Sequence, residues 1–268
     1  EIASCLVGSE MCIRDRCMFA QTQNELHNMK HMSILAVSLL ALVACTPEKK
    51  QEADYSQYVN PMIGTDFTGN TYPGAQVPFG MVQLSPDNGL PGWDRISGDF
   101  YPDTTIAGFS HTHLSGTGAG DLYDISFMPV TRPYKEAPAP LGIYSTFSHN
   151  DEAASAGYYR VLLKDYNINV ELTATERCGI QRYTFPEAEA SVFLNLKKAM
   201  NWDFTLDSKI EVVDSTTIRG YRLSQGWSPL QHVYFETRFS KPFVACHMDT
   251  TSIAVSYTHL TLPTICSV

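Results

Sequence analysis

Positive charge is scarce in this sequence of 268 residues. It contains 19 Lys and Arg against 28 Asp and Glu, so its formal net charge is -9 at neutral pH. Because nucleic-acid binding depends on neutralising phosphates with clustered cations, this balance argues against a nucleic-acid partner. Charged residues make up only 18% of the chain and hydrophobic residues 44%, which excludes a disordered chain, a collagen-like repeat and a long coiled coil.

A hydrophobic run long enough to cross a membrane is also missing. The longest candidate, residues 33–44, is shorter than the about 18–20 apolar residues that a spanning helix needs. It follows the short basic stretch 29–31 and has the length of a secretory signal core. It ends in Leu-Val-Ala-Cys, which resembles a bacterial lipobox with Cys45 as the lipidated residue; an ordinary signal peptide is the alternative.

These features predict a signal peptide over residues 29–45 and a charged tether over 46–54. The protein is then an exported bacterial lipoprotein, periplasmic or at the cell surface, whose only membrane contact is its lipid anchor. Both ends of the sequence look foreign, since residues 1–16 and 255–268 resemble translated sequencing adapters. We therefore treat residues 1–28 as a non-native leader and 255–268 as an adapter-derived tail of an incomplete gene, and expect residues 55–254 to form the folded body.

Cysteine is rare in that body, where only Cys178 and Cys246 occur. Export permits a disulfide between them, but the sequence does not require one, and we expect two buried free thiols.

Helical periodicity longer than two turns is absent from the body. Residues 59–131 are rich in Gly, Pro and aromatics and predict loops with short strands, such as 80–84 and 122–130. From about residue 157 the pattern becomes alternation, with Ile168, Val170 and Leu172 on one face of a strand. Together these signals predict an all-β antiparallel β-sandwich. Further strands are expected at residues 158–164, 179–185, 191–196, 211–213, 217–223, 233–239 and 244–247.

Residues 108–121, with the sequence GFSHTHLSGTGAGD, form the stretch with the most chemistry. Alternate residues of a strand share a face, so His111 and His113 could ligate a metal with Asp121 or Asp124. A hydrogen-bonded polar loop is the competing interpretation. The glycine spacing does not match a dinucleotide-binding loop, and the stretch lacks the second Gly of a nucleophile elbow.

Residues 92–101 contain an aromatic ring beside carboxylates and an Arg. That combination suits sugar recognition, because Trp93 could stack on the apolar face of a sugar while charged groups bind its hydroxyls. The alternative is a core Trp with charged neighbours at the surface.

An ordered series of motifs runs through the body and covers about residues 55–245. The series closely resembles the N-terminal domain of glycoside hydrolase family 92, the bacterial exo-acting α-mannosidases. Its main motifs are YVNPMIGT at 58–65, TYPGAQVPFGMVQLSPD at 71–87 and the 108–121 stretch. The downstream motifs are YSTFSH at 144–149, AGYYRV at 156–161, ELTATER at 171–177 and RYTFP at 182–186.

The resemblance implies a two-domain enzyme. An antiparallel β-sandwich of the galactose-mutarotase-like supersandwich type would precede a helical (α/α) barrel that is missing here. Family members depend on calcium and release α-linked mannose with inversion, using an acid and a base that lie in the barrel. We therefore expect no catalytic residue and few calcium ligands in this chain. Its expected partners are mannose-containing glycans and its own C-terminal helical domain.

In such an enzyme the sandwich supplies one wall of the mannose site. The residues expected to bind substrate are Gly64, Thr65, Trp93, Asp94, His111 and His113; no metal ligand is assigned among them. Gly64 would allow close approach of the backbone and Trp93 would stack on the sugar, whereas a structural role for either histidine stays open. The chain alone is expected to be inactive. Competing functions are a stand-alone carbohydrate-binding sandwich, a metal-dependent hydrolase using His111 and His113, and an amidase acting on glycoproteins.

Overall fold

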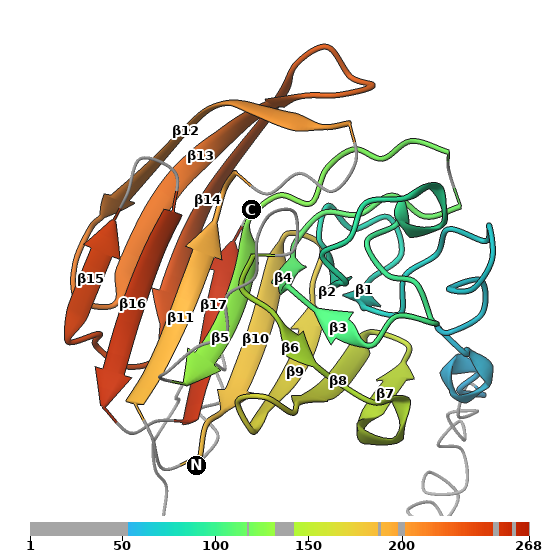
Figure 1. The fold of residues 1–268 in the computed structure, drawn as a ribbon, viewed down its shortest axis with the longest axis horizontal. Coiled ribbons are helices and arrows are strands. Elements are labelled where there is room, and N and C mark those ends of the chain that lie inside the picture. The colour runs from blue at the N-terminus through green and yellow to red at the C-terminus, as the bar shows by residue number, and fades with distance from the viewer. Residues whose placement is uncertain are drawn as a thin grey trace, which may run out of the picture. The chain divides into compact units, whose positions relative to one another are not determined.

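Alternating buried and exposed side chains shape most of the strands in the computed structural model (Figure 1). The structure describes residues 53–116, 118–131, 142–186, 189–197, 202–248, 252–258 and 261–267. From Asp54 onward these residues form one unit. Within them the structure contains strands and short 3-10 helices but no α-helix. The 3-10 helices are η1 (Ser56–Tyr58), η2 (Trp93–Arg95) and η3 (His149–Asp151).

One sheet has seven strands in the order β1-β2-β4-β5-β11-β16-β15, and each neighbouring pair is antiparallel. It combines short strands from the loop-rich half of the body with longer ones from the second half. Its strands are β1 (Ala75–Gln76), β2 (Gln83–Asp87), β4 (Gly108–Ser110), β5 (Ser126–Thr131), β11 (Glu189–Asn195), β15 (Ala245–Met248) and β16 (Ser252–Thr258).

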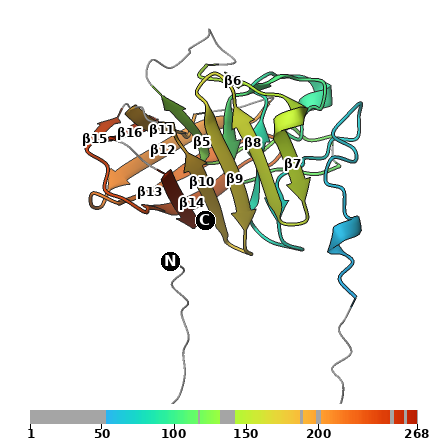
Figure 2. The same ribbon diagram turned by 90° about the horizontal axis from the view of Figure 1, so that it is seen from below.

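The other large sheet has eight strands in the order β12-β13-β14-β17-β10-β9-β8-β7, also antiparallel. Figure 2 shows β7 to β10 lying side by side along one face of the molecule. Its strands are β7 (Glu152–Ser155), β8 (Tyr158–Leu163), β9 (Ile168–Ala174), β10 (Cys178–Thr184), β12 (Phe204–Val212), β13 (Thr217–Gln225), β14 (Gln231–Phe239) and β17 (Thr261–Ser267). A separate antiparallel pair consists of β3 (Thr105–Ile106) and β6 (Ser145–Thr146).

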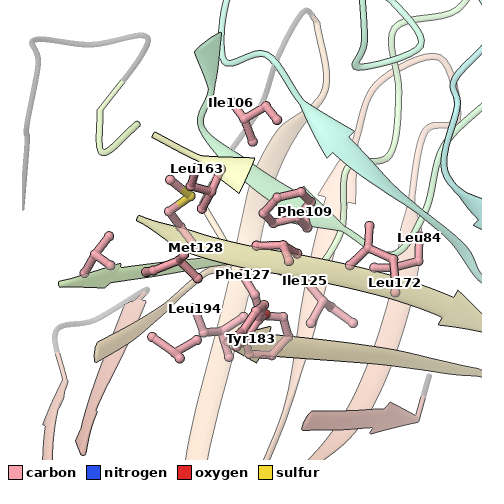
Figure 3. Close-up of a cluster of buried hydrophobic side chains, with 14 of the residues drawn as sticks. Leu84, Ile106, Phe109, Ile125, Phe127, Met128, Leu163, Leu172, Tyr183 and Leu194 are labelled. Atoms are coloured by element: carbon pink, nitrogen blue, oxygen red, sulfur yellow. The ribbon is translucent and has the colours of Figure 1, made fainter. Parts of the chain in front are cut away.

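The hydrophobic core lies between the two large sheets (Figure 3). Leu84, Phe127 and Leu194 enter it from the seven-stranded sheet, and Leu172 and Tyr183 enter it from the eight-stranded sheet. All five are at most 1% exposed. Side chains from the two inner faces therefore interdigitate, as in other β-sandwiches. The expected all-β antiparallel sandwich is confirmed.

The C-terminal residues take part in both sheets, although the sequence analysis had set 255–268 apart from the fold. Strand β16 pairs with β11 and β15, and β17 lies between β14 and β10. Without β17, the backbone N–H and C=O groups of β10 and β14 that face it would lack hydrogen-bond partners. A strand between β10 and β14 is therefore favoured. Pro263 of β17 lies opposite Arg182 of β10. Strand β14 pairs only with residues 264–267 of β17, so Pro263 has no partner on that side and its missing N–H is tolerated.

Three further expectations concern export and cysteine chemistry. Cys178 and Cys246 are both free thiols, and each is partly exposed where burial had been expected. Cys45, the leader, the signal peptide and most of the tether lie outside the described residues. None of the helices in the described residues has the length and hydropathy of a membrane span.

Candidate functional site

Three loops that carry the motif residues meet in the structure. They are residues 62–72, 92–101 and 111–124, and we call them the loop cluster. Hydrogen bonds that span long sequence separations join the loops to each other. These bonds run from Tyr101 N–H to Thr65 O (2.9 Å), from Ser97 Oγ to Thr71 O (2.9 Å), from Gly116 N–H to Asn70 O and from Tyr123 Oη to Ile96 O.

Gly64 and Thr65 occupy the turn of the first loop. Gly64 has φ +88°, in the left-handed region that favours glycine, and a Cβ there would lie 2.9 Å from the Thr71 side chain. Thr65 is buried, and its hydroxyl donates to Met62 O at 3.0 Å. The space beside Gly64 is thus filled by Thr71, and the Thr65 side chain serves the turn itself.

Trp93 begins helix η2, and its side chain is 58% exposed. It lies against the backbone of the third loop, because a Cβ on Gly118 would be 3.1 Å from Trp93 Cη2. This indole is a surface ring that packs on one side against glycine, which excludes the core-Trp alternative. Asp94 is half-buried and accepts no hydrogen bond from a described residue, so its carboxylate is available to a ligand. Arg95 instead pairs with Asp103, at 2.6 Å from Nε to Oδ2.

His111 lies inside the sandwich with an exposed fraction of 0%. Its Nδ1 donates to Ile125 O at 2.8 Å, and its Nε2 has no hydrogen-bond partner among the described residues. A Cβ on Gly179 of β10 would be 2.9 Å from that Nε2. Burial lowers the pKa of His111 to about 4, so the ring is neutral at pH 7. The ring fills a polar niche in the interior.

His113 is buried as well, and its ring bonds to the chain on both sides. Nδ1 donates to Gln83 O at 2.7 Å, and Nε2 lies 2.9 Å from Asp87 Oδ1 and 3.1 Å from Ser110 Oγ. Ser110 and Asp87 are themselves fully buried, so this Ser–His–Asp group has no access for a substrate. Its geometry ties β2 to β4 beneath the loop cluster.

Asp121 and Asp124 also bond to the protein. Asp121 accepts from the N–H of Trp227 (2.8 Å) and of Ser228 (3.1 Å), and Asp124 pairs with Arg222 at 2.6 Å. The described residues contain no group of three or more His, Cys, Asp or Glu side chains arranged to hold a metal ion. Each candidate metal ligand thus bonds to a different group of the protein. These candidates are His111, His113, Asp121 and Asp124.

Comparisons with known proteins identify the family of this domain. The sequence model of the glycosyl hydrolase family 92 N-terminal domain matches residues 58–258. The chain therefore belongs to glycosyl hydrolase family 92. A family 92 α-mannosidase from Bacteroides thetaiotaomicron, solved in complex with mannoimidazole, is 34% identical with a TM-score of 0.73, over 79% of this chain and 32% of that one.

Two other relatives extend the comparison of this family 92 domain. The family 92 inverting mannosidase of Bacteroides thetaiotaomicron VPI-5482 shares the fold at 23% identity and a TM-score of 0.64, over 81% of this chain and 32% of that one. An uncharacterized secreted glycosidase of Arthroderma benhamiae is 26% identical over 172 residues, which cover 60% of this chain and 21% of the relative. The chain thus spans about a third or less of the length of these relatives.

All six expected substrate-binding residues belong to the loop cluster, but only Trp93 is exposed. Gly64 and Asp94 are half-buried, and Thr65, His111 and His113 are buried. Sugar contact by any of the six stays a prediction. Sequence analysis overlooked Trp227, which is 79% exposed on the β13–β14 turn. A large aromatic between Gly226 and Ser228, where turns favour small residues, was the signal that could have found it.

Acidic side chains beside the loop cluster have displaced pKa values. Burial raises the pKa of Asp99 well above its usual range, and the negative charges of Glu152, Asp103 and Asp87 raise it further. Tyr159 donates its hydroxyl to Glu152 and is fully buried, so its pKa is raised also. Asp99 and Tyr159 lie inside the protein and are not accessible to a ligand.

Proposed function

We propose that this chain is the carbohydrate-contacting N-terminal domain of an exported α-mannosidase that removes terminal α-linked mannose from glycans with inversion. The observation that carries the proposal is the exposed indole of Trp93, set beside Gly118 in the loop cluster of a family 92 domain. An exposed aromatic ring that packs against glycine, beside the half-buried carboxylate of Asp94, suits one wall of a sugar site.

We further propose that the chemical step depends on residues other than those described. An inverting glycosidase needs a carboxylic acid and a carboxylate about 6.5–9.5 Å apart on either side of the sugar. In the loop cluster and its supports, the carboxylates of Asp87, Asp121 and Asp124 are occupied by protein donors. Asp99 is buried, and Asp66 accepts the backbone N–H of Phe67 at 2.7 Å, so each of these carboxylates except Asp94 is buried or bonded to the protein.

Calcium belongs to the proposal through the family resemblance. A calcium ion takes six to eight oxygen ligands, usually several of them carboxylates. The described part of the chain offers no group of three acidic or imidazole side chains that could hold an ion. The described residues therefore do not fit a calcium site.

Export through a lipidated Cys45 completes the proposal. It is supported by the lipobox-like end of the apolar run and by a relative named as a secreted glycosidase. Labelling of the expressed protein with a radioactive fatty acid, lost in Cys45→Ser, tests it.

The central experiment is a titration of the full chain with methyl α-mannoside, followed by saturation-transfer NMR, which detects weak binding. Methyl α-glucoside, which differs at one hydroxyl, is the matched ligand. We expect mannoside binding that falls roughly tenfold in Trp93→Ala, since truncating an aromatic contact at the centre of a site costs more than about 1 kcal/mol. The variant should keep its fold, because Trp93 is largely exposed.

Tyr234→Ala is the control, because Tyr234 is 60% exposed but lies on strand β14 outside the loop cluster. It should bind methyl α-mannoside as the parent chain does. The same samples are tested for release of 4-nitrophenol from its α-mannoside, and we expect none. Turnover by this chain, or equal binding of the two sugars with no effect of Trp93→Ala, would contradict the proposal.

A further inference from the structure

All three tryptophans of the chain are exposed. Trp93, Trp202 and Trp227 have exposed fractions of 58%, 41% and 79%. Tryptophan is highly buried on average, because it carries the largest apolar surface of any side chain. Three exposed indoles in one domain therefore need an explanation, and their attachment points supply it.

Trp227 is held in place by the buried carboxylate of Asp121, which is 3% exposed. Asp121 accepts the N–H of Trp227 and of Ser228, and its Oδ2 also accepts from Gln231 Nε2 at 3.2 Å. A Cβ on Gly226 would lie 2.3 Å from Asp121 Oδ1, so the close approach requires glycine there. The turn between β13 and β14 is thus fixed by three hydrogen bonds, while the side chain of Trp227 stays in solvent.

Trp202 is tied to the same loop through a buried ion pair. Its neighbour Asp203 accepts from Arg222 Nη2 at 2.9 Å, and Nη1 of that Arg222 donates to Asp124 at 2.6 Å. Both ion pairs have fully buried side chains. The backbone beside Trp202 therefore has a fixed position relative to Asp124.

Trp93 contacts the other end of this loop at Gly118. The indole of Trp93, the backbone of Trp227 and the residue after Trp202 are thus linked to one segment, residues 118–124. Gly118 and Asp121 are three residues apart, so even a fully extended chain separates them by no more than about 11 Å. In Figure 1 this segment and the turn between β13 and β14 lie at the same end of the sheets.

The surroundings of the three rings favour a sugar over a protein partner. Their immediate described neighbours in the chain are small or acidic, namely Gly92, Asp94, Asp203, Gly226 and Ser228, and the exposed Phe204 and Leu230 lie two and three residues away. Protein interfaces instead surround an aromatic anchor with further apolar contacts. Separate aromatic faces among hydrogen-bonding groups match a chain of pyranose rings, each with an apolar face and a polar rim.

We propose that Trp93, Trp202 and Trp227 form an aromatic track along residues 118–124 that binds the glycan beyond its terminal mannose. The inference rests on the proposed function and extends it to the sugars that follow. Trp202 and Trp227 contact those sugars, and Asp121 is the positioning residue that holds Trp227. The track makes affinity depend on glycan length.

The test compares methyl α-mannoside with an α-linked mannotriose on the full chain. We expect Trp227→Ala and Trp202→Ala to weaken mannotriose binding roughly tenfold each, as for other aromatic contacts in a binding site. Methyl α-mannoside binding should stay within twofold of the parent. Tyr234→Ala, which removes an exposed ring on β14 outside the track, should change neither affinity.

Asp121→Asn tests the positioning role, since one of its carboxylate oxygens becomes an NH2 group that cannot accept the turn's N–H. We expect weaker mannotriose binding and, in the double variant with Trp227→Ala, no further loss, because the two act through one contact. A residue that only stabilised the fold would give additive losses and would weaken both ligands.

The outcomes separate this inference from the proposed function. If the parent chain binds methyl α-mannoside but neither Trp227→Ala nor Trp202→Ala changes the ratio of mannotriose to monosaccharide affinity, the aromatic track is wrong and the mannose site stands. That result would point to a protein surface covering the two rings. If the parent binds neither ligand, the proposed function fails and this inference fails with it.

Discussion

At the scale of single residues, the loop cluster holds ionisable side chains where water does not reach them. Asp99 is 5% exposed, and burial together with three nearby carboxylates raises its pKa well above the usual 3.8. His111 responds in the opposite way, because burial lowers its pKa to about 4. Desolvation favours the neutral form of both groups, so the interior beneath the loops carries less charge than its sequence suggests.

Asp99→Asn should stabilise the protein at neutral pH. Because the folded-state pKa of Asp99 lies above its unfolded value, the protonated carboxyl contributes full stability below pH 3.8, and this contribution is lost as pH rises through the folded pKa. An amide is neutral at every pH and nearly the same shape. The free energy of unfolding of Asp99→Asn, measured in urea, should therefore exceed that of the parent at pH 7 and converge with it near pH 3.

Asp214→Asn provides a control of opposite sign. Backbone and side-chain hydrogen bonds from Thr216 lower the pKa of Asp214, so its ionised form contributes stability above the unfolded pKa. Its amide variant should lose stability at pH 7 relative to pH 3. A pH dependence unchanged by Asp99→Asn would show that Asp99 ionises normally in the folded protein.

The sequence indicates the environment of a residue only where that environment does not depend on distant parts of the chain. The loop around Trp93 left a core position open, and the family resemblance implied a ring that stacks on sugar; the ring is exposed. The burial of His111 and His113 could not be foreseen, since it depends on Gly179 and Gly98, which leave room beside the rings from distant parts of the chain. A His-x-His pair looks the same in sequence whether loops cover it or leave it open.

At the scale of elements, strands that pack on one face were visible in the sequence. The expected strand 168–174 matches β9, whose buried residues alternate along its length. Strand β12 was expected only at 211–213 but runs from Phe204 to Val212. It forms an edge of the eight-stranded sheet and has no buried residue, so it shows no regular alternation. A pattern based on burial cannot reveal a strand that buries nothing.

Leu206→Lys on this edge should be tolerated and should reduce self-association. Leu206 is 48% exposed, and a charge on an edge strand discourages pairing with another chain. The free energy of unfolding should change by less than about 0.5 kcal/mol, as for other surface substitutions. Sedimentation velocity at increasing concentration should show less oligomer than the parent.

The matched control is Leu194→Lys on β11, where the side chain is 1% exposed in the core. Burying an unpaired ammonium there should prevent folding. Equal loss of structure in both variants, followed by circular dichroism, would mean that β12 is packed against other parts of the protein.

At the scale of the whole molecule, Arg222 joins the two sheets at the end that carries the loop cluster. It belongs to β13 of the eight-stranded sheet, and its side chain is 0% exposed. It donates to Asp124, which precedes β5, and to Leu196 O at 3.0 Å, which follows β11; both of those strands belong to the seven-stranded sheet. The segment that carries Trp202 and the loop that precedes β5 are therefore fixed to both layers by one buried cation.

Arg222→Met should destabilise the whole unit by about 3–5 kcal/mol, because removing one partner leaves Asp124 and Asp203 buried without their counter-charge. Arg219→Met lies on the same strand and breaks an exposed pair with Glu211, which should leave the free energy of unfolding almost unchanged. Urea unfolding followed by far-ultraviolet circular dichroism and by tryptophan fluorescence measures both variants. If Arg222 joins the layers, the two signals shift together to lower urea; a shift in fluorescence alone would mean that it stabilises only the loops.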